Sequence, residues 1–138
     1  MNKKYNIRYI EAKDLDIIRN WWIERKEEPI ELDLLPQNGL GGLIIENKDI
    51  MIAACFIYLT NSKIGYIDHL ISNPDYKEKG FWHYPFMQAC FEAAKNSGCN
   101  EVWGTSCVRS VVKRLNRYGC KILKEPHYII SYKKTNNK

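Results

Sequence analysis

The sequence of 138 residues lacks the features that mark several protein classes. It has no Cys-x-x-Cys pair, and its five cysteines are odd in number, widely spread and without a histidine cluster nearby. We therefore expect no metal site and no disulfide framework, but buried thiols in a reducing cytosol. The longest apolar run, Ile50–Leu59, is far shorter than the roughly 20 residues of a membrane helix, and residues 1–6 contain no secretory apolar region. A cytoplasmic protein without a membrane partner is expected.

Repeats, linkers and low-complexity segments are also missing, apart from the polar end at residues 135–138. A chain of this length forms one ordinary domain, which buries about two thirds of its unfolded surface. A hydrophobic content of 45% and four tryptophans favour a packed core over disorder. We predict a single domain over residues 1–138.

Positive charge is concentrated in the last part of the chain. Of 21 basic and 16 acidic residues, nine basic and one acidic lie in residues 109–138. A nucleic-acid site, an anionic cofactor and a solvated basic face each explain this distribution. Composition alone does not choose among them.

Hydrophobic periodicity predicts an alternation of strands and helices. Strands are expected at residues 6–10, 43–46, 50–60, 64–72, 101–105, 120–123 and 128–133. Helices are expected from the N-cap Asp14 to near Lys26, from about residue 82 to Asn96 with a stop signal at Gly98, and over residues 108–117. Residues 27–42 are rich in proline and glycine, which predicts a loop with a short or irregular helix.

The most informative segment is residues 72–82, where an apolar strand stops and an amphipathic helix begins. One face of that helix carries Phe86, Ala89, Cys90, Ala93 and Ala94. A turn before a helix presents backbone N–H groups and the positive end of the helix dipole, and here it also carries Lys77 and Lys79. Such a turn is suited to a phosphate or diphosphate.

Residues 74–80, P-D-Y-K-E-K-G, resemble the P-E-Y-R-G-K-G signature of the GNAT superfamily of acyl-CoA-dependent N-acyltransferases. In the general form R/Q-x-x-G-x-G/A, the fixed positions are Lys77, Gly80 and Trp82, and tryptophan stands where the family has a small residue. The order of elements over residues 6–134 is also similar. The resemblance implies a mixed α/β (α+β) fold, with a mostly antiparallel sheet of six to seven strands and helices on both faces.

The resemblance implies acetyl-CoA, or another acyl-CoA, as the cofactor. Pantetheine is expected between the fourth and fifth strands, bonded to backbone groups of Leu70, Ile71 and Ser72. The diphosphate is expected at the turn that follows. That turn comprises Lys77, Glu78, Lys79, Gly80, Phe81 and Trp82.

Acyl transfer needs an unprotonated amine and a proton for the leaving thiolate. Asp68, in the strand that leads to the turn, is the candidate base that removes the proton of the ammonium. The alternatives are that Asp68 pairs with a neighbouring lysine or caps a bulge. Tyr66 is expected on the same face of the strand, whereas His69 is expected to point the other way. The positions of the family's usual acid and of its helix asparagine hold Leu115 and Val108, so proton donors are sought in Tyr118, Ser106 or water.

The sequence therefore predicts an N-acyltransferase that passes an acetyl or other short acyl group directly to a primary amine of a small molecule or peptide. Two alternatives stay open: a catalytically silent GNAT-like module that binds acyl-CoA or a protein, and a small nucleic-acid-associated protein. Residues 24–33 hold five carboxylates, which form either an acceptor wall for a cationic amine or a solvated helix end.

Overall fold

The computed structural model describes residues 4–78, 82–104, 113, 115–116 and 120–121. The chain divides into two units, residues 1–105 and 106–138. In the second unit, the N–H of Cys120 donates a hydrogen bond to the carbonyl of Leu115 at 3.1 Å. Most of the helix predicted at 108–117 and of the strands predicted at 120–123 and 128–133 lies outside the described residues. The single domain stays a prediction.

The described part of the first unit is built on one sheet whose strands follow in chain order. These are β1 (Asn6–Tyr9), β2 (Gly42–Asn47), β3 (Ile50–Leu59), β4 (Ile64–Ser72) and β5 (Glu101–Trp103). The pairs from β1 to β4 are antiparallel, and β5 runs parallel to β4. The predicted mixed fold with a mostly antiparallel sheet is confirmed, with five strands in the described residues.

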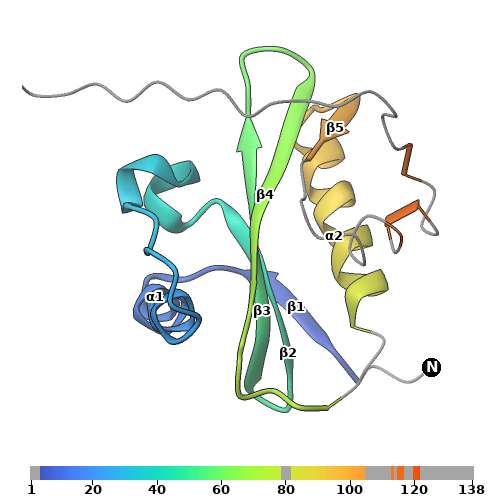
Figure 1. Ribbon diagram of the computed structural model, residues 1–138. Coiled ribbons are helices and arrows are strands. Elements are labelled where there is room, and N and C mark those ends of the chain that lie inside the picture. Colours follow the sequence, from blue (N-terminus) through green and yellow to red (C-terminus); the bar gives the residue numbers. More distant parts are fainter. Residues whose placement is uncertain (1–3, 79–81, 105–112, 114, 117–119, 122–138) are drawn as a thin grey trace, which may run out of the picture. The chain divides into compact units, whose positions relative to one another are not determined.

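Alternation along the central strands sends side chains into two core clusters, because neighbouring strand residues point to opposite faces. Ala54 belongs to one cluster and Cys55 to the other. The first cluster joins the sheet to α1 (Leu15–Glu24) through Ile18, Trp21 and Trp22. The second joins it to α2 (His83–Asn96) through Trp82, Phe86, Cys90 and Ala94. Figure 1 shows the sheet nearly edge-on, with α1 and α2 on either side of it.

Three of the cysteines lie in the second cluster or at its edge. Cys55, Cys90 and Cys99 are buried free thiols, as predicted, and Cys120 is a partly buried one. Contact with the Cys90 thiol and burial raise the pKa of Cys55 well above its usual value.

The segment between α1 and β2 forms two short 3-10 turns, η2 (Leu32–Leu34) and η3 (Pro36–Gly39), which agrees with the irregular helix predicted there.

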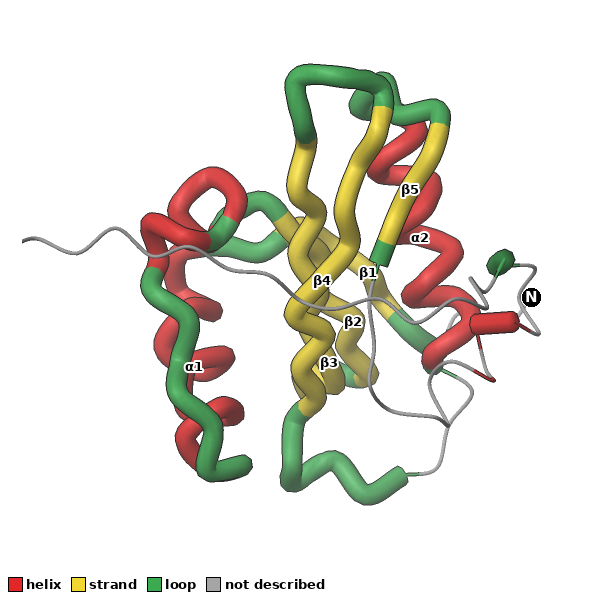
Figure 2. The backbone as a smooth tube through the Cα atoms, turned by 45° about the horizontal axis from the view of Figure 1, so that its top comes forward, coloured by secondary structure: helices red, strands yellow, loops and turns green. Residues whose placement is uncertain are grey.

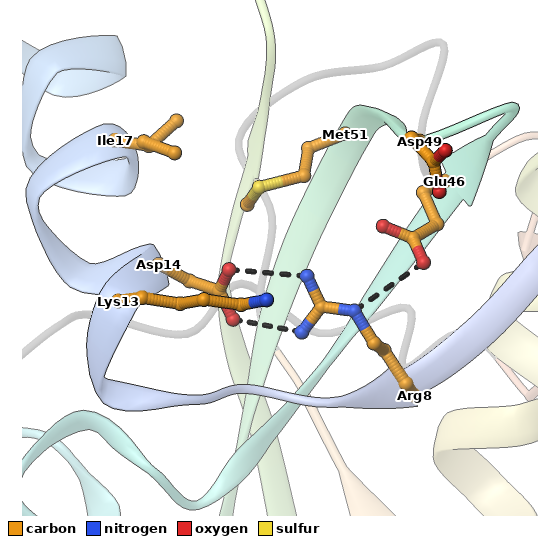
Figure 3. Close-up of a pocket in the computed structure, with 7 residues that line it drawn as sticks. All are labelled: Arg8, Lys13, Asp14, Ile17, Glu46, Asp49 and Met51. Carbon is orange, nitrogen blue, oxygen red and sulfur yellow. Dashed lines mark hydrogen bonds and ion pairs between the residues drawn. The ribbon is translucent and has the colours of Figure 1, made fainter.

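A charged network ties β1 to the start of α1. The Arg8 guanidinium donates to both carboxylate oxygens of Asp14, at 2.8 and 3.0 Å, and to Glu46 at 3.3 Å. Asp14 is 1% exposed and also accepts a hydrogen bond from the N–H of Glu11. Asp14 is the N-cap residue of α1, as predicted, but its side chain makes no capping hydrogen bond to the helix, because the carboxylate is bonded to Arg8 and to the N–H of Glu11. Figure 3 shows this network in a cavity of about 390 Å³.

β4 contains a bulge opposite Cys55. Phe56 pairs with Asp68, but Ala54 pairs with Ile71, so an extra residue is inserted between these two pairs. His69 has a φ of 57°, in the left-handed region that non-glycine residues rarely adopt. The Asp68 carboxylate accepts a hydrogen bond from the N–H of His69 at 2.7 Å. Asp68 therefore caps the bulge, one of the roles considered for it from the sequence.

We expect Asp14→Asn to lower the free energy of unfolding at neutral pH by about 2 to 3 kcal/mol, because the partly buried Arg8 loses its bidentate charged partner. Denaturant unfolding followed by circular dichroism measures this. Asp16→Asn, which changes an exposed acid two residues away, is the control and should stay within about 0.5 kcal/mol of the parent.

The same variant changes the pH dependence. Burial alone would raise the pKa of Asp14, but the hydrogen bonds from Arg8 and Glu11 hold it below its usual value. A lowered folded-state pKa means that Asp14 stabilises the fold above about pH 4, and that this contribution is lost as the pH falls through the folded value. Stability of the parent should therefore fall more steeply on acidification than that of Asp14→Asn. Equal slopes would contradict the assignment.

His69→Gly should be more stable than His69→Ala by about 1 kcal/mol, because glycine adopts a left-handed φ without steric strain. Both changes remove the ring, so the difference isolates the backbone. The same two substitutions at the exposed strand residue Leu59 are the control, where alanine should be the more stable by about 0.5 to 1 kcal/mol. If glycine were the less stable at position 69, the left-handed conformation would be wrong.

Candidate functional site

Among the described residues, the edge of β4 that faces β5 is paired along only part of its length. β5 pairs with β4 only over residues 64–66 in the part of the chain that the structure describes. Figure 2 shows β5 beside the half of β4 that follows the β3–β4 turn. Residues 67–72 of β4 therefore have no hydrogen-bonded strand on that side among the described residues. Leu70 is 39% exposed, Ile71 is buried in the cluster under α1, and Ser72 is half-buried.

The turn after β4 is held in place by Asn73. Its N–H donates to the carbonyl of Ile52 at 2.7 Å, and its side-chain amide donates to the carbonyl of Met51 at 2.9 Å. In return, Asn73 accepts from the N–H groups of Asp75 and Tyr76, at 2.9 and 3.2 Å. The Tyr76 amide is thus used inside the turn. The amides of Lys77 and Glu78 have no acceptor among the described residues.

A cavity of about 150 Å³ lies against this turn. Its lining includes the predicted residues Ser72, Lys77, Glu78 and Trp82. Ile52, Asn73, Pro74 and Tyr76 also line it, as does Arg25, which the sequence analysis missed. Lys79, Gly80 and Phe81 lie outside the described residues. The structure thus brings four of the predicted cofactor residues together around one cavity.

Arg25, the residue directly after α1, also lines this cavity. Its Nε and Nη2 donate to the carbonyl of Ser72 at 3.2 and 3.0 Å, and Nη2 also donates to the Ser72 hydroxyl at 2.8 Å. Because 47 positions separate the two residues, no local pattern in the sequence announces the contact. Pantetheine is predicted to bind backbone groups of Ser72 among others, and the carbonyl of this residue is bonded to Arg25.

Glu78 is engaged in a different set of contacts. Its carboxylate forms an ion pair with Lys4 and accepts a hydrogen bond from the Tyr76 hydroxyl at 3.1 Å. The contacts with Lys4 and Tyr76 lower the pKa of Glu78. The negative charge of Glu78 is thus matched by Lys4, a residue that no sequence pattern connects with it.

Trp82 stands at the start of α2 and belongs to the core. Its side chain is 8% exposed, its ring stacks on that of His83 with centroids 3.6 Å apart, and it packs at a tilt against Phe86. The indole therefore fills space under the helix while also lining the cavity. Pro85, the third residue of α2, removes one N–H from the first turn of the helix.

The face of the sheet under α1 gathers several polar side chains of β3 and β4. Tyr66 pairs with Tyr58, and Asp68 pairs with Phe56, which stacks on Trp22 of α1. The predicted shared face of Tyr66 and Asp68 is thereby confirmed. The prediction for His69 is wrong: its ring meets that of Tyr58 edge-on at 5.9 Å, because the bulge rotates it onto the same face.

Tyr58 connects this face with the segment that follows α1. Its hydroxyl donates to the carbonyl of Leu34 at 3.0 Å. Burial and, to a smaller extent, the negative charge of Asp68 raise the pKa of Tyr58 above its usual value. The phenol therefore stays protonated at neutral pH. Tyr58 is the second residue that the sequence analysis missed, although its place opposite Tyr66 follows from the β3–β4 hairpin.

The remaining predicted residues either lie outside the described residues or are exposed. Tyr118, Ser106 and Val108 lie outside the described residues. The five carboxylates of residues 24–33 are all exposed. Over the described ranges, no group of three or more His, Cys, Asp or Glu side chains is arranged to hold a metal ion. A search of the same ranges finds no helix with the length and hydrophobicity to cross a membrane.

The arrangement combines two chemical environments along β4. At its carboxyl end, Arg25 and Lys77 line a small cavity next to two backbone amides that have no acceptor among the described residues, which suits an anion. Along its middle, the carboxylate of Asp68 lies on the same face as a tyrosine pair and an imidazole. An anionic donor in the cavity at the carboxyl end and a polar acceptor on the face along the middle would meet at β4.

A comparison of the sequence with protein-family models gives no match, and neither does a comparison with curated proteins. Solved structures do match. An acetyltransferase from Trypanosoma brucei has a TM-score of 0.64 and 13% identity, over 92% of this chain and 99% of that one. An aminoglycoside acetyltransferase from an uncultured soil metagenomic sample, in complex with sisomicin, has a TM-score of 0.64 and 12% identity, over 94% and 97%.

A third match is part of a larger protein. N-acetylglutamate synthase from Neisseria gonorrhoeae, complexed with coenzyme A and L-arginine, has a TM-score of 0.66 and 14% identity, over 84% of this chain and 27% of that one. At these identities the likeness concerns the fold. The chain has the GNAT fold.

Proposed function

We propose that this protein transfers an acetyl or other short acyl group from an acyl-CoA to a primary amine. The observation that carries the proposal is the cavity at the carboxyl end of β4, lined by Arg25 and Lys77 in a chain with the GNAT fold. Two of the neighbours named above are acetyltransferases, and the third, an N-acetylglutamate synthase, was solved with coenzyme A. The cavity would take the diphosphate of the donor, and the open edge of β4 would take its pantetheine.

The predicted diphosphate site comprises Lys77, Glu78 and the segment through Trp82, and the predicted pantetheine site comprises the backbone of Leu70, Ile71 and Ser72. In this proposal the amides of Lys77 and Glu78 remain available to phosphate oxygens, because no described residue accepts from them. Glu78 serves through its backbone, since its side chain is paired with Lys4. Trp82 forms a wall of the cavity.

The chemistry needs few groups. Asp68, directly or through a water, would take the proton of the ammonium, and the amine would then attack the thioester carbonyl. The new C–N bond forms as the C–S bond breaks, and the leaving thiolate takes a proton from Tyr118 or from water. Tyr66 would orient the acceptor beside Asp68. Asp68 can both cap the bulge and act as base, because the bond from His69 engages Oδ1 and leaves Oδ2 without a partner among the described residues.

We also propose that residues 106–138 complete the fold with the helix and the two strands that their pattern predicts, and that the protein works in the cytoplasm. The second statement is supported by the buried free thiols, which a reducing compartment preserves.

Acetyl-CoA at a hundred times its Kd should stabilise the native protein by about 2.7 kcal/mol, measured as a thermal shift. With a panel of polyamines, aminoglycosides and peptide amines, free CoA should then appear in chromatographic assays. A shift without release of CoA would select the silent binding module over the enzyme. Absence of a shift would contradict the proposal. Binding of DNA with a steep salt dependence, and none of acetyl-CoA, would favour the nucleic-acid alternative.

Asp68→Asn tests the base. The amide oxygen still accepts from His69, so the bulge is kept, but the side chain no longer takes a proton. Turnover at neutral pH should fall about 100-fold or more, while the Kd for acetyl-CoA changes less than about twofold. Asp16→Asn, which changes an exposed acid in the first turn of α1, is the control for the loss of one negative charge. Unchanged turnover would dismiss Asp68 as the base.

A further inference from the structure

The contact between Arg25 and Ser72 fixes a guanidinium at the mouth of the predicted cofactor site. Three hydrogen bonds hold it: one from Nε and two from Nη2. Arg25 follows α1, whereas every other residue that lines this cavity belongs to β3, β4, the turn after β4 or the start of α2. The cation therefore comes from a separate part of the fold.

Among the described residues, none neutralises the charge on this guanidinium. Both Ser72 acceptors are uncharged, and no described carboxylate lies within ion-pairing distance of Arg25 or of Lys77. The acid on the same cavity wall, Glu78, is matched by Lys4. Two cations in one small cavity, with no counterion in the described part of the chain, favour the binding of an anion.

The geometry also leaves donors available. A guanidinium has five N–H groups in a rigid fork. The bonds to Ser72 use the Nε hydrogen and both Nη2 hydrogens, so the two Nη1 hydrogens remain, with no acceptor among the described residues. An arginine that neutral acceptors already hold in position loses little side-chain freedom when it binds a phosphate.

We propose that Arg25 binds a phosphate of the acyl donor through Nη1, adding a contact from the α1 end to those from the turn after β4. The inference rests on the proposed function and deepens it, since it assigns a donor-recognition role to a residue outside the β4–α2 turn. It also assigns Ser72 the role of a positioning residue, which holds the guanidinium toward the cavity.

Three probes separate the possible roles of Arg25: acetyl-CoA, S-acetylpantetheine, which has the same thioester arm without phosphates, and inorganic pyrophosphate. Titration calorimetry measures the Kd of each for the parent and for Arg25→Gln. The variant should bind acetyl-CoA and pyrophosphate at least about tenfold more weakly, because one charge-assisted contact is lost, and should bind S-acetylpantetheine within about twofold of the parent.

Two further variants control the result. Arg19→Gln removes an exposed positive charge from α1 and should leave all three Kd values unchanged. Arg25→Lys keeps the charge without the fork and should fall between the parent and Arg25→Gln. Added KCl should weaken acetyl-CoA binding more for the parent than for Arg25→Gln. Thermal unfolding confirms that each variant is folded.

The outcomes are distinct. Equal weakening of acetyl-CoA and S-acetylpantetheine would mean that Arg25 only shapes the end of β4, and would overturn the inference. So would an unchanged Kd for acetyl-CoA in Arg25→Gln. If the parent bound pyrophosphate through Arg25 but not acetyl-CoA, the phosphate site would stand and the proposed function would fall. If it bound neither, both would fall.

Discussion

The bulge in β4 is the constraint from which the arrangement of the candidate site follows. A regular strand would place Leu70 and Ser72 on the face of Asp68. The extra residue instead turns His69 toward Tyr58 and brings Ile71 into the core under α1. The bulge is itself supported by the Asp68 carboxylate, so the residue proposed as base also maintains the irregularity around it.

Two charged clusters in the first unit differ in a way that separates structure from function. Around Arg8, each charge has a partner: Asp14 and Glu46 match the guanidinium, and Asp14 is buried. Such a network fixes elements together and leaves little for a ligand. Around Arg25, neutral acceptors orient the cation, and none of the carboxylates that the structure describes forms an ion pair with it. The second pattern is typical of a binding site, where the missing counterion is the ligand.

Local pattern predicted the five strands of the described residues to within about two residues, and Phe86 and Cys90 as part of the buried face of α2, because alternation and helical periodicity act over a few residues. Local pattern did not predict the orientation of the His69 side chain. A histidine with a left-handed φ has no sequence signal of the kind that glycine provides. Nor did local pattern find Arg25 or the partner of Glu78, which lie far away in the sequence. The sequence thus predicted those site residues that lie in one strand and the turn after it. It missed the residues that only the tertiary fold brings to the site.

The sulfur atoms in the core have a practical consequence. Cys55, Cys90 and Cys99 are at most 8% exposed, and Cys55 and Cys90 join β3 to α2. An alkylating reagent reaches a thiol so placed only when the helix separates from the sheet, and the raised pKa of Cys55 slows its reaction further. Alkylation kinetics, resolved cysteine by cysteine with mass spectrometry, would thus time the opening of this interface without an added label.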